Sequence, residues 1–184
     1  ENLIESELFG YKKGAFTGAV EDYQGVFDRC SPFGSILLDE IGEVSEAIQI
    51  KLLQVLQERT FVPVGDHKQR RFSGRVIAAT NRPMAQIRQE HILRDDFFYR
   101  LCSDVIAVPS LAQRIRQDHH ELKDLVSHTV SRIVGTCSPE LADRLHRLVI
   151  DQLGHDYLWP GNVRELEQCV RRLLLNKSYQ PFAS

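Results

Sequence analysis

Apolar residues in the first 110 positions gather in short runs that predict buried strands. The runs are Ile36–Leu38, Val76–Ala79 and Val105–Val108, and each is continuous rather than alternating with polar residues. Continuous runs are typical of strands in a parallel sheet that is covered on both faces. The pattern therefore predicts an α/β core in which each run is one buried strand.

Between the first two runs, the apolar positions change to helical spacing. Ser45 and Glu46 open this segment, and Ser45 suits the capping position of a helix. The apolar residues that recur at helical spacing are Ile48, Leu52, Leu53, Val55 and Leu56. The next segment, Phe61 to Phe72, contains a Pro-Val-Gly-Asp turn and predicts a small hairpin.

After Pro109 the chain shows helical periodicity, in three amphipathic segments. Their apolar positions are Leu122, Leu125, Val126, Val130 and Ile133, then Leu141, Leu145, Leu148 and Val149, then Val163, Leu166, Val170, Leu173 and Leu174. Ser138 and Pro139 suit the cap and the first residue of the second helix. The sequence thus predicts an α/β unit over residues 1–110 and an all-helical unit over residues 111–184.

Composition indicates a globular chain without a membrane span. Of the 184 residues, 42% are apolar and 26% are charged, which is ordinary for globular domains. No run approaches the roughly 18 apolar residues of a membrane span, and we expect a cytoplasmic protein. The net charge of −2 gives no basic excess, so these residues are not expected to grip DNA by themselves.

Polar side chains directly follow the first two predicted strands. Asp39 and Glu40 follow the first run, and Thr80 and Asn81 follow the second. Ligands bind at the carboxyl ends of strands in open α/β sheets. Nucleotide hydrolysis needs a carboxylate that holds Mg²⁺, suited to Asp39, and a second that orients the attacking water, suited to Glu40. Thr80 and Asn81 could bind water or the terminal phosphate; the alternative is strands that simply run into solvent.

Two arginines flank three consecutive aromatic residues before the third run. Arg94 and Arg100 lie six residues apart. A guanidinium is always charged and forks onto phosphate oxygens, including those of a nucleotide bound to a neighbouring subunit. The alternative for this segment is a surface salt bridge to Asp95 or Asp96.

The last predicted helix carries a third candidate arginine. Asn162 suits the cap of this helix, and Arg164 lies in its first turn. A cation near a helix N-terminus is electrostatically unfavourable, so Arg164 needs an anionic partner. That partner is either a nucleotide phosphate or a nearby carboxylate, Glu165 or Asp156.

Small residues surround a single aromatic residue near the start of the chain. The segment consists of Gly14, Ala15, Phe16, Thr17, Gly18 and Ala19. Small, flexible residues suit a loop tip that presents Phe16 outward, with little local side-chain surface for its ring to pack against. An exposed aromatic residue on a mobile loop is typical of a partner contact. The alternative is a loop that tucks Phe16 into the core.

Together and in this order, these motifs resemble the sigma-54 activator branch of the AAA+ ATPases. The resemblance covers roughly residues 2 to 176. Glu5–Gly10 followed by Lys13–Ala19 is similar to the polymerase-contact loop of that family, Leu37–Glu43 to its Walker B strand, Ala79–Asn81 to its first sensor, Arg94 and Arg100 to its two ring-interface arginines, and Trp159–Leu166 to its second sensor.

The resemblance implies a partial AAA+ (RecA-like) parallel-sheet core, followed by a small helical lid. It implies a hexameric ring that uses ATP and Mg²⁺, with the nucleotide at each subunit interface. One subunit would supply Asp39, Glu40, Thr80, Asn81 and Arg164, and its neighbour Arg94 and Arg100. The Gly14–Ala19 loop would contact sigma-54 RNA polymerase, and hydrolysis would move this loop to help open the promoter.

The sequence lacks the GxxxxGK[ST] phosphate loop of the family. We expect that the chain starts after this element, that these residues alone do not hydrolyse ATP, and that a domain outside them binds DNA. Two other interpretations stay open: a non-hydrolysing regulator that keeps the loop as a binding surface, and another AAA+ machine such as a helicase loader or unfoldase. Intact Asp39 and Glu40 argue against the first, and the Gly14–Ala19 segment argues against the second.

Overall fold

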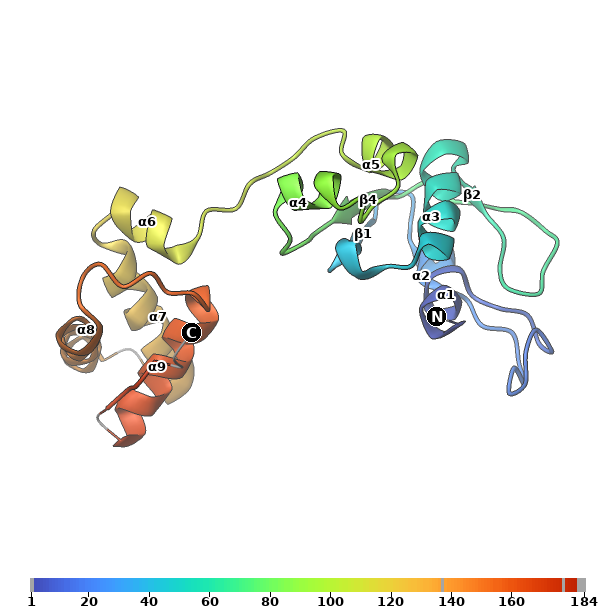
Figure 1. Ribbon diagram of the computed structural model, residues 1–184. Helices are drawn as coiled ribbons and strands as arrows, with labels where there is room; N and C mark the ends of the chain where they lie inside the picture. Colours follow the sequence, from blue (N-terminus) through green and yellow to red (C-terminus); the bar gives the residue numbers. More distant parts are fainter. Residues whose placement is uncertain (1, 137, 177, 182–184) are drawn as a thin grey trace. The chain divides into compact units, whose positions relative to one another are not determined.

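The computed structural model describes residues 2–136, 138–176 and 178–181 (Figure 1). The chain forms two compact units that divide between Val105 and Ile106. The sequence prediction placed this boundary after residue 110.

The first unit contains helices, a parallel strand pair and a hairpin. Its elements are α1 (Asn2–Phe9), α2 (Val26–Arg29), β1 (Ser35–Leu38), a 3₁₀ helix (Ile41–Glu43), α3 (Glu46–Glu58), β2 (Thr60–Phe61), β3 (Arg70–Arg71), β4 (Arg75–Ala78), α4 (Met84–Gln89) and α5 (Asp95–Leu101). Strands β1 and β4 pair in parallel, with Ile36 beside Val76, while β2 and β3 pair antiparallel. The first two predicted strands, the helix between them and the hairpin are therefore confirmed.

Aromatic rings fill the centre of the first unit. Phe27 stacks on Phe9 with ring centroids 5.4 Å apart and meets the edge of Phe72 at 5.0 Å. Helix α3 turns Ile48 and Leu52 into the same core. Because Ile36 of β1 belongs to the same core, α1, α2 and α3 cover the buried face of the strand pair.

One predicted strand and one predicted feature of the sheet are wrong. Val105–Val108 forms no strand, and Ile106 is 85% exposed. A strand needs the N–H and C=O groups of a neighbouring strand, and in the described residues β1 and β4 pair only with each other. Leu37 and Ile77, opposite each other in the register, are also exposed. The parallel pair is therefore covered on one face rather than on both.

Ser45 precedes α3 but does not cap it with its side chain. Its carbonyl accepts a hydrogen bond from the Gln49 backbone N–H over 3.0 Å, whereas its hydroxyl makes no capping bond. The buried Ser45 Oγ has no hydrogen-bond partner among the described residues. Ser45 therefore occupies the predicted N-cap position, but its hydroxyl does not bond the free N–H groups of the first turn.

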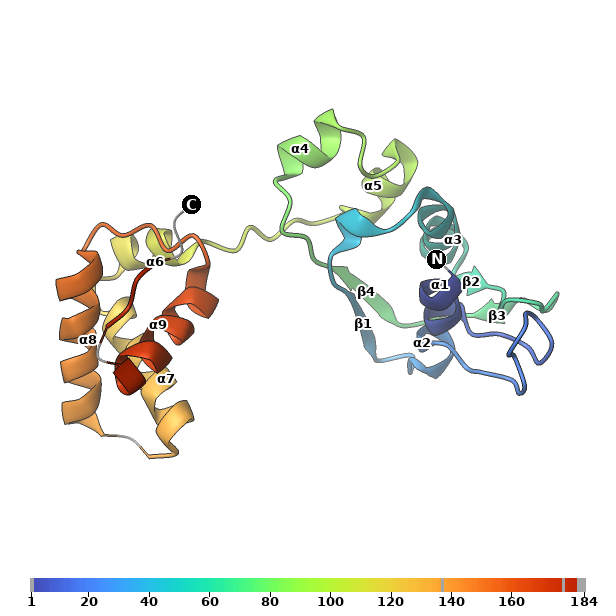
Figure 2. The same ribbon diagram turned by 60° about the horizontal axis from the view of Figure 1, so that its bottom comes forward.

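The second unit is all-helical. Its helices are α6 (Leu111–Gln117), α7 (Glu121–Val134), α8 (Pro139–Leu153) and α9 (Asn162–Asn176). Helices α7, α8 and α9 lie side by side, with α6 across one end (Figure 2). The Ser138 hydroxyl accepts from the Leu141 N–H and Pro139 opens α8, so this predicted helix start is confirmed. Ser110 and Gln113 form a capping box that starts α6, a helix that the sequence analysis did not separate.

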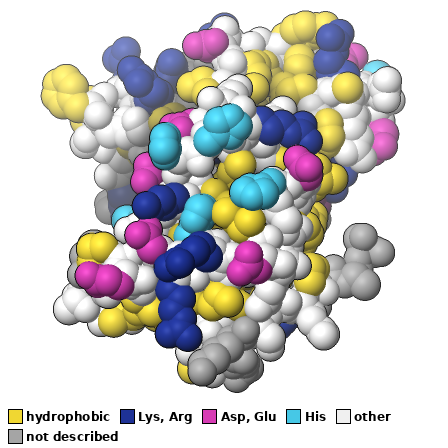
Figure 3. All heavy atoms as spheres, turned by 90° about the vertical axis from the view of Figure 1, so that its left-hand side faces the viewer, with side chains coloured by type: hydrophobic (Ala, Val, Ile, Leu, Met, Phe, Trp, Pro, Cys, Tyr) yellow, Lys and Arg dark blue, Asp and Glu magenta, His cyan; other side chains and the backbone are white. Residues whose placement is uncertain are grey.

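Charges of both signs mix on the surface. On the face drawn in Figure 3, histidines and basic side chains lie among acidic ones. In the helical unit, Lys123 pairs with Asp143 at 2.9 Å and Arg132 pairs with Glu167 at 2.5 Å. Within the ranges that the structure describes, no helix is long and apolar enough to span a membrane.

Leu166→Ala is expected to destabilise the helical unit by about 2–5 kcal/mol, because the removed atoms lie in a close-packed core. Leu166 is 0% exposed, whereas Leu175 on the same helix is 82% exposed. Leu175→Ala is therefore the matched control, with an expected change within about 0.5 kcal/mol. Trp159, buried and the single tryptophan of the chain, reports urea unfolding of this unit by fluorescence. Equal midpoints for both variants would contradict this packing.

Candidate functional site

The ends of β1 and β4 bring two of the predicted site residues into contact. Glu40 follows β1, Asn81 follows β4, and the two strands are parallel neighbours. Asn81 Nδ2 donates a hydrogen bond to Glu40 Oε1 over 3.2 Å, although the residues lie 41 positions apart in the chain. The carboxylate assigned to the attacking water and the amide assigned to the first sensor therefore lie at one edge of the sheet.

The turn after β1 holds both carboxylates in an exposed position. Glu40 has a left-handed backbone with φ of 54°, a conformation that costs energy for a residue with a side chain and that clusters at functional sites. Asp39 Oδ1 accepts from the Glu40 N–H over 3.1 Å. The Ile41 N–H donates to the Ala79 carbonyl over 2.9 Å, so the turn stays attached to β4. Both Asp39 and Glu40 are exposed at this edge.

An ion pair beside these residues was missed by the sequence analysis. Arg82 donates from Nε and Nη2 to Glu43 Oε1, at 2.9 and 2.5 Å. The Thr80 hydroxyl accepts from the Arg82 N–H over 3.2 Å. The turns after β1 and β4 are thus joined by this pair as well as by the Glu40–Asn81 bond. The signal that could have found it is the opposite charge that follows each strand end by a few positions.

Arg94 is held within its own unit. Its guanidinium pairs with Glu46 at 2.6 Å and with Asp96 at 3.0 Å. The hydrogen bonds that Arg94 donates to Asp96, and next to Glu46, raise the pKa of Arg94, and its bond to Asp96 lowers the pKa of that carboxyl group. The backbone N–H of Arg94 donates to Oε1 of the buried Gln49 over 2.9 Å. Arg94 therefore forms the salt bridge to Asp96 that was the alternative to a role at a subunit interface.

Arg100 differs from Arg94 because no carboxylate pairs with it among the described residues. Its Nε and Nη2 each donate over 3.2 Å to the Leu56 carbonyl, near the C-terminus of α3, where helical carbonyls lack intrahelical partners. The residue is exposed. Arg100 therefore keeps an uncompensated charge at the surface, whereas the charge of Arg94 is paired.

Arg164 lies in the first turn of α9, in the helical unit, and is exposed. Neither carboxylate proposed as its ordinary partner pairs with it in the described part of the chain. Glu165 instead accepts from the Tyr157 hydroxyl at 2.5 Å and from the Gly161 N–H at 2.8 Å. Burial and this hydrogen bond raise the pKa of Tyr157. The arginine therefore remains available to an external anion.

Asn162 was predicted to cap α9, but its side chain bonds to a different helix. Asn162 Oδ1 accepts from the N–H of Leu111 over 2.8 Å, so the side chain satisfies the first turn of α6 rather than that of α9. Sequence spacing could not show this contact, because the two residues are 51 positions apart.

The Gly14–Ala19 segment forms a closed tip. Gly14 and Gly18 have φ of 82° and 102°, which glycine adopts without strain, and the Gly14 N–H donates to the Ala19 carbonyl over 2.8 Å. Phe16 is 40% exposed. The rest of its ring packs edge-on against the ring of Tyr11, with the two ring centroids 4.9 Å apart. The ring therefore packs on Tyr11, which lies outside the loop, rather than on its immediate neighbours in the sequence.

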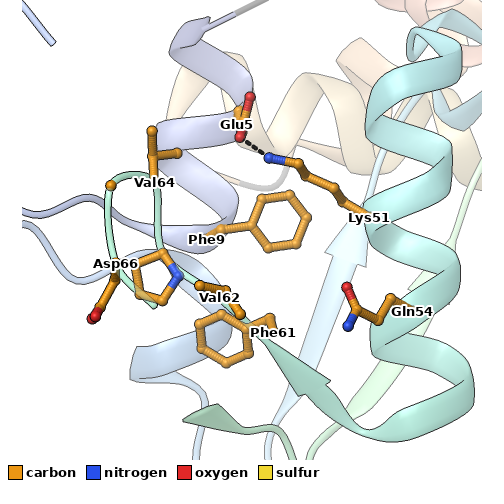
Figure 4. Close-up of a pocket in the computed structure, with 10 residues that line it drawn as sticks. Glu5, Phe9, Lys51, Gln54, Phe61, Val62, Val64 and Asp66 are labelled. Atoms are coloured by element: carbon orange, nitrogen blue, oxygen red, sulfur yellow. Dashed lines mark hydrogen bonds and ion pairs between the residues drawn. The ribbon is translucent and has the colours of Figure 1, made fainter. Parts of the chain in front are cut away.

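A cavity of about 280 Å³ lies between α1, α3 and the segment after β2 (Figure 4). Glu5 and Lys51 form an ion pair at its edge. Val64 and Gly65, which line the cavity, also contact the base of the Phe16 loop through Lys12 and Ala15. None of the predicted catalytic or nucleotide-binding residues lines this cavity.

A parallel strand pair with carboxylates and an amide at its shared edge is typical of a ligand site in an open α/β sheet, and together with the separate helical unit it agrees with an AAA+ domain. Arg94, Arg100 and the Gly14–Ala19 loop are the features that distinguish one family within this class. Residues 1–107 match the sigma-54 interaction domain, and the chain belongs to that family.

Curated relatives agree with this family. The chain is 42% identical over 177 residues to nitrogen fixation protein VnfA of Azotobacter vinelandii, covering 95% of the chain and 32% of VnfA. It is 40% identical over 182 residues to regulatory protein AtoC of Escherichia coli (strain K12), covering 97% of the chain and 37% of AtoC. The Nif-specific regulatory protein of Klebsiella pneumoniae is 43% identical over 173 residues, with coverage of 94% and 31%. The chain spans about a third of the length of these relatives.

Solved structures show the same fold. NtrX from Brucella abortus in complex with ADP superposes with a TM-score of 0.71 at 26% identity, over 98% of this chain and 37% of NtrX. NtrX in complex with ATP gives a TM-score of 0.71 at 26% identity, over 95% and 36%. The predicted AAA+ α/β core with an all-helical portion is confirmed.

Proposed function

We propose that this chain is the catalytic part of a longer sigma-54-dependent activator, which couples ATP hydrolysis to the remodelling of sigma-54 RNA polymerase. The observation that carries the proposal is that one compact unit holds both the Glu40–Asn81 pair and the exposed Phe16 loop. Hydrolysis and partner contact can then be coupled within a single folded body. The activator would act in the cytoplasm, and a domain outside these residues would bind DNA.

The strand-end residues fit a magnesium-bound nucleotide. Mg²⁺ takes oxygen ligands, and the exposed Asp39 carboxylate engages only the Glu40 N–H among the described residues. Thr80 and Asn81 offer donors for phosphate oxygens. NtrX, crystallised with ADP and with ATP, shares this fold. A phosphate loop elsewhere in the longer protein would complete the site.

Each side chain has a distinct role in the proposal. When bound, ATP with Mg²⁺ supplies the phosphoryl group that is transferred to water. Asp39 would hold the metal, and Glu40 would orient the attacking water and accept its proton. Asn81 positions the Glu40 carboxylate through their hydrogen bond. In a hexameric ring, Arg94 and Arg100 lie at the subunit interface, and Arg100 stabilises charge on the phosphates bound by its neighbour.

Phe16→Ala tests the proposed function. In the full-length activator, we expect this variant to lose sigma-54 binding and open-complex formation while ATP hydrolysis stays within about twofold of wild type. The ring is partly exposed at a loop tip and lies away from Glu40 in the chain, so its loss removes partner contact without changing the catalytic edge. Sigma-54 binding, ATPase rate and melting temperature are measured on the same preparation.

Val20→Ala is the matched control, because Val20 is an exposed apolar residue just beyond the loop. It should leave all three measurements unchanged. If Phe16→Ala instead melts several degrees lower and loses ATPase activity together with sigma-54 binding, Phe16 is a packing residue and the proposal fails. Retention of sigma-54 binding by Phe16→Ala would also defeat it.

A further inference from the structure

Three aromatic rings run in series from the Phe16 loop to α1. The Phe16 ring meets Tyr11 at 4.9 Å with an interplanar angle of 63°. Tyr11 in turn stacks on Tyr23 at 5.3 Å and 21°. The Tyr23 hydroxyl donates to Glu7 Oε2 on α1 over 2.8 Å. Phe16 is therefore connected, ring by ring, to a helix of the core.

Backbone hydrogen bonds fix Tyr11 on both sides. Tyr11 and Tyr23 exchange N–H to carbonyl bonds of 3.0 and 2.9 Å. On its other side, Tyr11 bridges to Val64, and the Lys12 N–H donates to the Val64 carbonyl over 2.9 Å. The Tyr11 ring thus projects from a segment held by two neighbouring segments.

The loop tip, in contrast, is held by backbone bonds of its own, from the Gly14 N–H to the Ala19 carbonyl over 2.8 Å and from the Ala19 N–H to the Phe16 carbonyl over 3.0 Å. A side chain added at Gly14 or Gly18 would meet no atom within 4 Å, so the space beside these two glycines is open. Asp22 closes the base of the loop by accepting from the Lys13 N–H over 2.9 Å and by pairing with Lys12. Beyond this closure, the Tyr11 ring is the aromatic surface that restrains Phe16.

We propose that Tyr11 is a positioning residue that holds Phe16 in the conformation to which sigma-54 binds. The inference rests on the proposed function of the Phe16 loop. Ordering a flexible side chain on binding costs affinity, and a contact that orders it beforehand recovers that cost. An edge-on aromatic pair shifts an equilibrium by about 2- to 12-fold. The 40% of Phe16 that remains exposed is then presented to the partner on a fixed support.

The test compares Tyr11→Leu with Tyr11→Phe in the full-length activator. Phenylalanine keeps the ring, whereas leucine keeps an apolar side chain without one. For sigma-54 binding, we expect the Kd to rise about 3- to 10-fold for Tyr11→Leu and to change less than about twofold for Tyr11→Phe. ATP hydrolysis should stay within about twofold in both. Tyr11→Met serves as a second ring-free variant if Tyr11→Leu lowers the melting temperature.

A double-variant cycle separates positioning from general damage to the loop. In a Phe16→Leu background the ring pair is already gone, so adding Tyr11→Leu should change the Kd for sigma-54 by less than about 1.5-fold. Unchanged or tighter binding by Tyr11→Leu, or an equal loss in both backgrounds, would overturn the inference. If Phe16→Ala retains sigma-54 binding, the proposed function itself fails. If Phe16→Ala loses sigma-54 binding and the ring-free Tyr11 variants keep it, only the positioning role of Tyr11 is contradicted.

Discussion

Glu40→Gln in the full-length activator is expected to lower ATP hydrolysis at least about 100-fold while ATP binding changes less than about twofold. The glutamine has nearly the same shape, and its side-chain carbonyl can still accept the hydrogen bond that Asn81 Nδ2 now donates to Glu40 Oε1. It cannot accept a proton from water. Steady-state phosphate release and a nucleotide titration measure the two effects separately.

The matched control is Glu43→Gln, in an exposed carboxylate three positions further along. Glu43 pairs with Arg82 rather than with Asn81, so its replacement should leave most of the hydrolysis rate. Asp39→Ala should instead weaken the Mg²⁺-dependent steps as well, because it removes the proposed metal ligand. Hydrolysis by Glu40→Gln at the wild-type rate would show that this carboxylate does not activate water.

Arg100→Ala is expected to reduce turnover by about 10³-fold, the size of effect that an arginine supplied across an interface has on phosphoryl transfer. Nucleotide binding to each subunit should persist, because Arg100 lies on α5, away from the Glu40–Asn81 edge in the chain. Its guanidinium is restrained only by the Leu56 carbonyl among the described residues. It can therefore turn toward a neighbour without breaking an ion pair.

Mixing distinguishes action in trans from action within a subunit. Arg100→Ala and Glu40→Gln subunits, each inactive alone, should recover part of the ATPase activity together, since some interfaces then combine an intact Arg100 with an intact Glu40. Arg171→Ala, in an exposed arginine of α9, controls for loss of surface charge. Absence of recovery at every mixing ratio, with hexamers verified, would count against a role across the interface.

The local elements of the fold could be predicted because their signals are local. Continuous apolar runs marked β1 and β4, and helical spacing marked α3 and the three long helices of the second unit. Val105–Val108 has the same signal as β1 but forms no strand. An apolar run shows that a segment is able to pair; it carries no information on whether a neighbouring strand is present to accept it.

In the candidate site, too, some contacts could be predicted from the sequence and others could not. The proximity of Glu40 and Asn81 could be predicted from their positions after strands, and in the structure Asn81 Nδ2 lies 3.2 Å from Glu40 Oε1. Tyr11 as the support of Phe16 and Arg82 as the partner of Glu43 could not be predicted. Each depends on a side chain brought from another segment by the packing of the whole unit, and sequence neighbours alone do not specify that geometry.

The hydrogen bond between Leu111 and Asn162 joins the starts of α6 and α9 in the helical unit. Leu111 is the first residue of the first helix that the chain forms in this unit, and Asn162 is the first residue of α9, two positions before Arg164. An anion bound at Arg164 would therefore act within one helical turn of the bond that holds the start of α6.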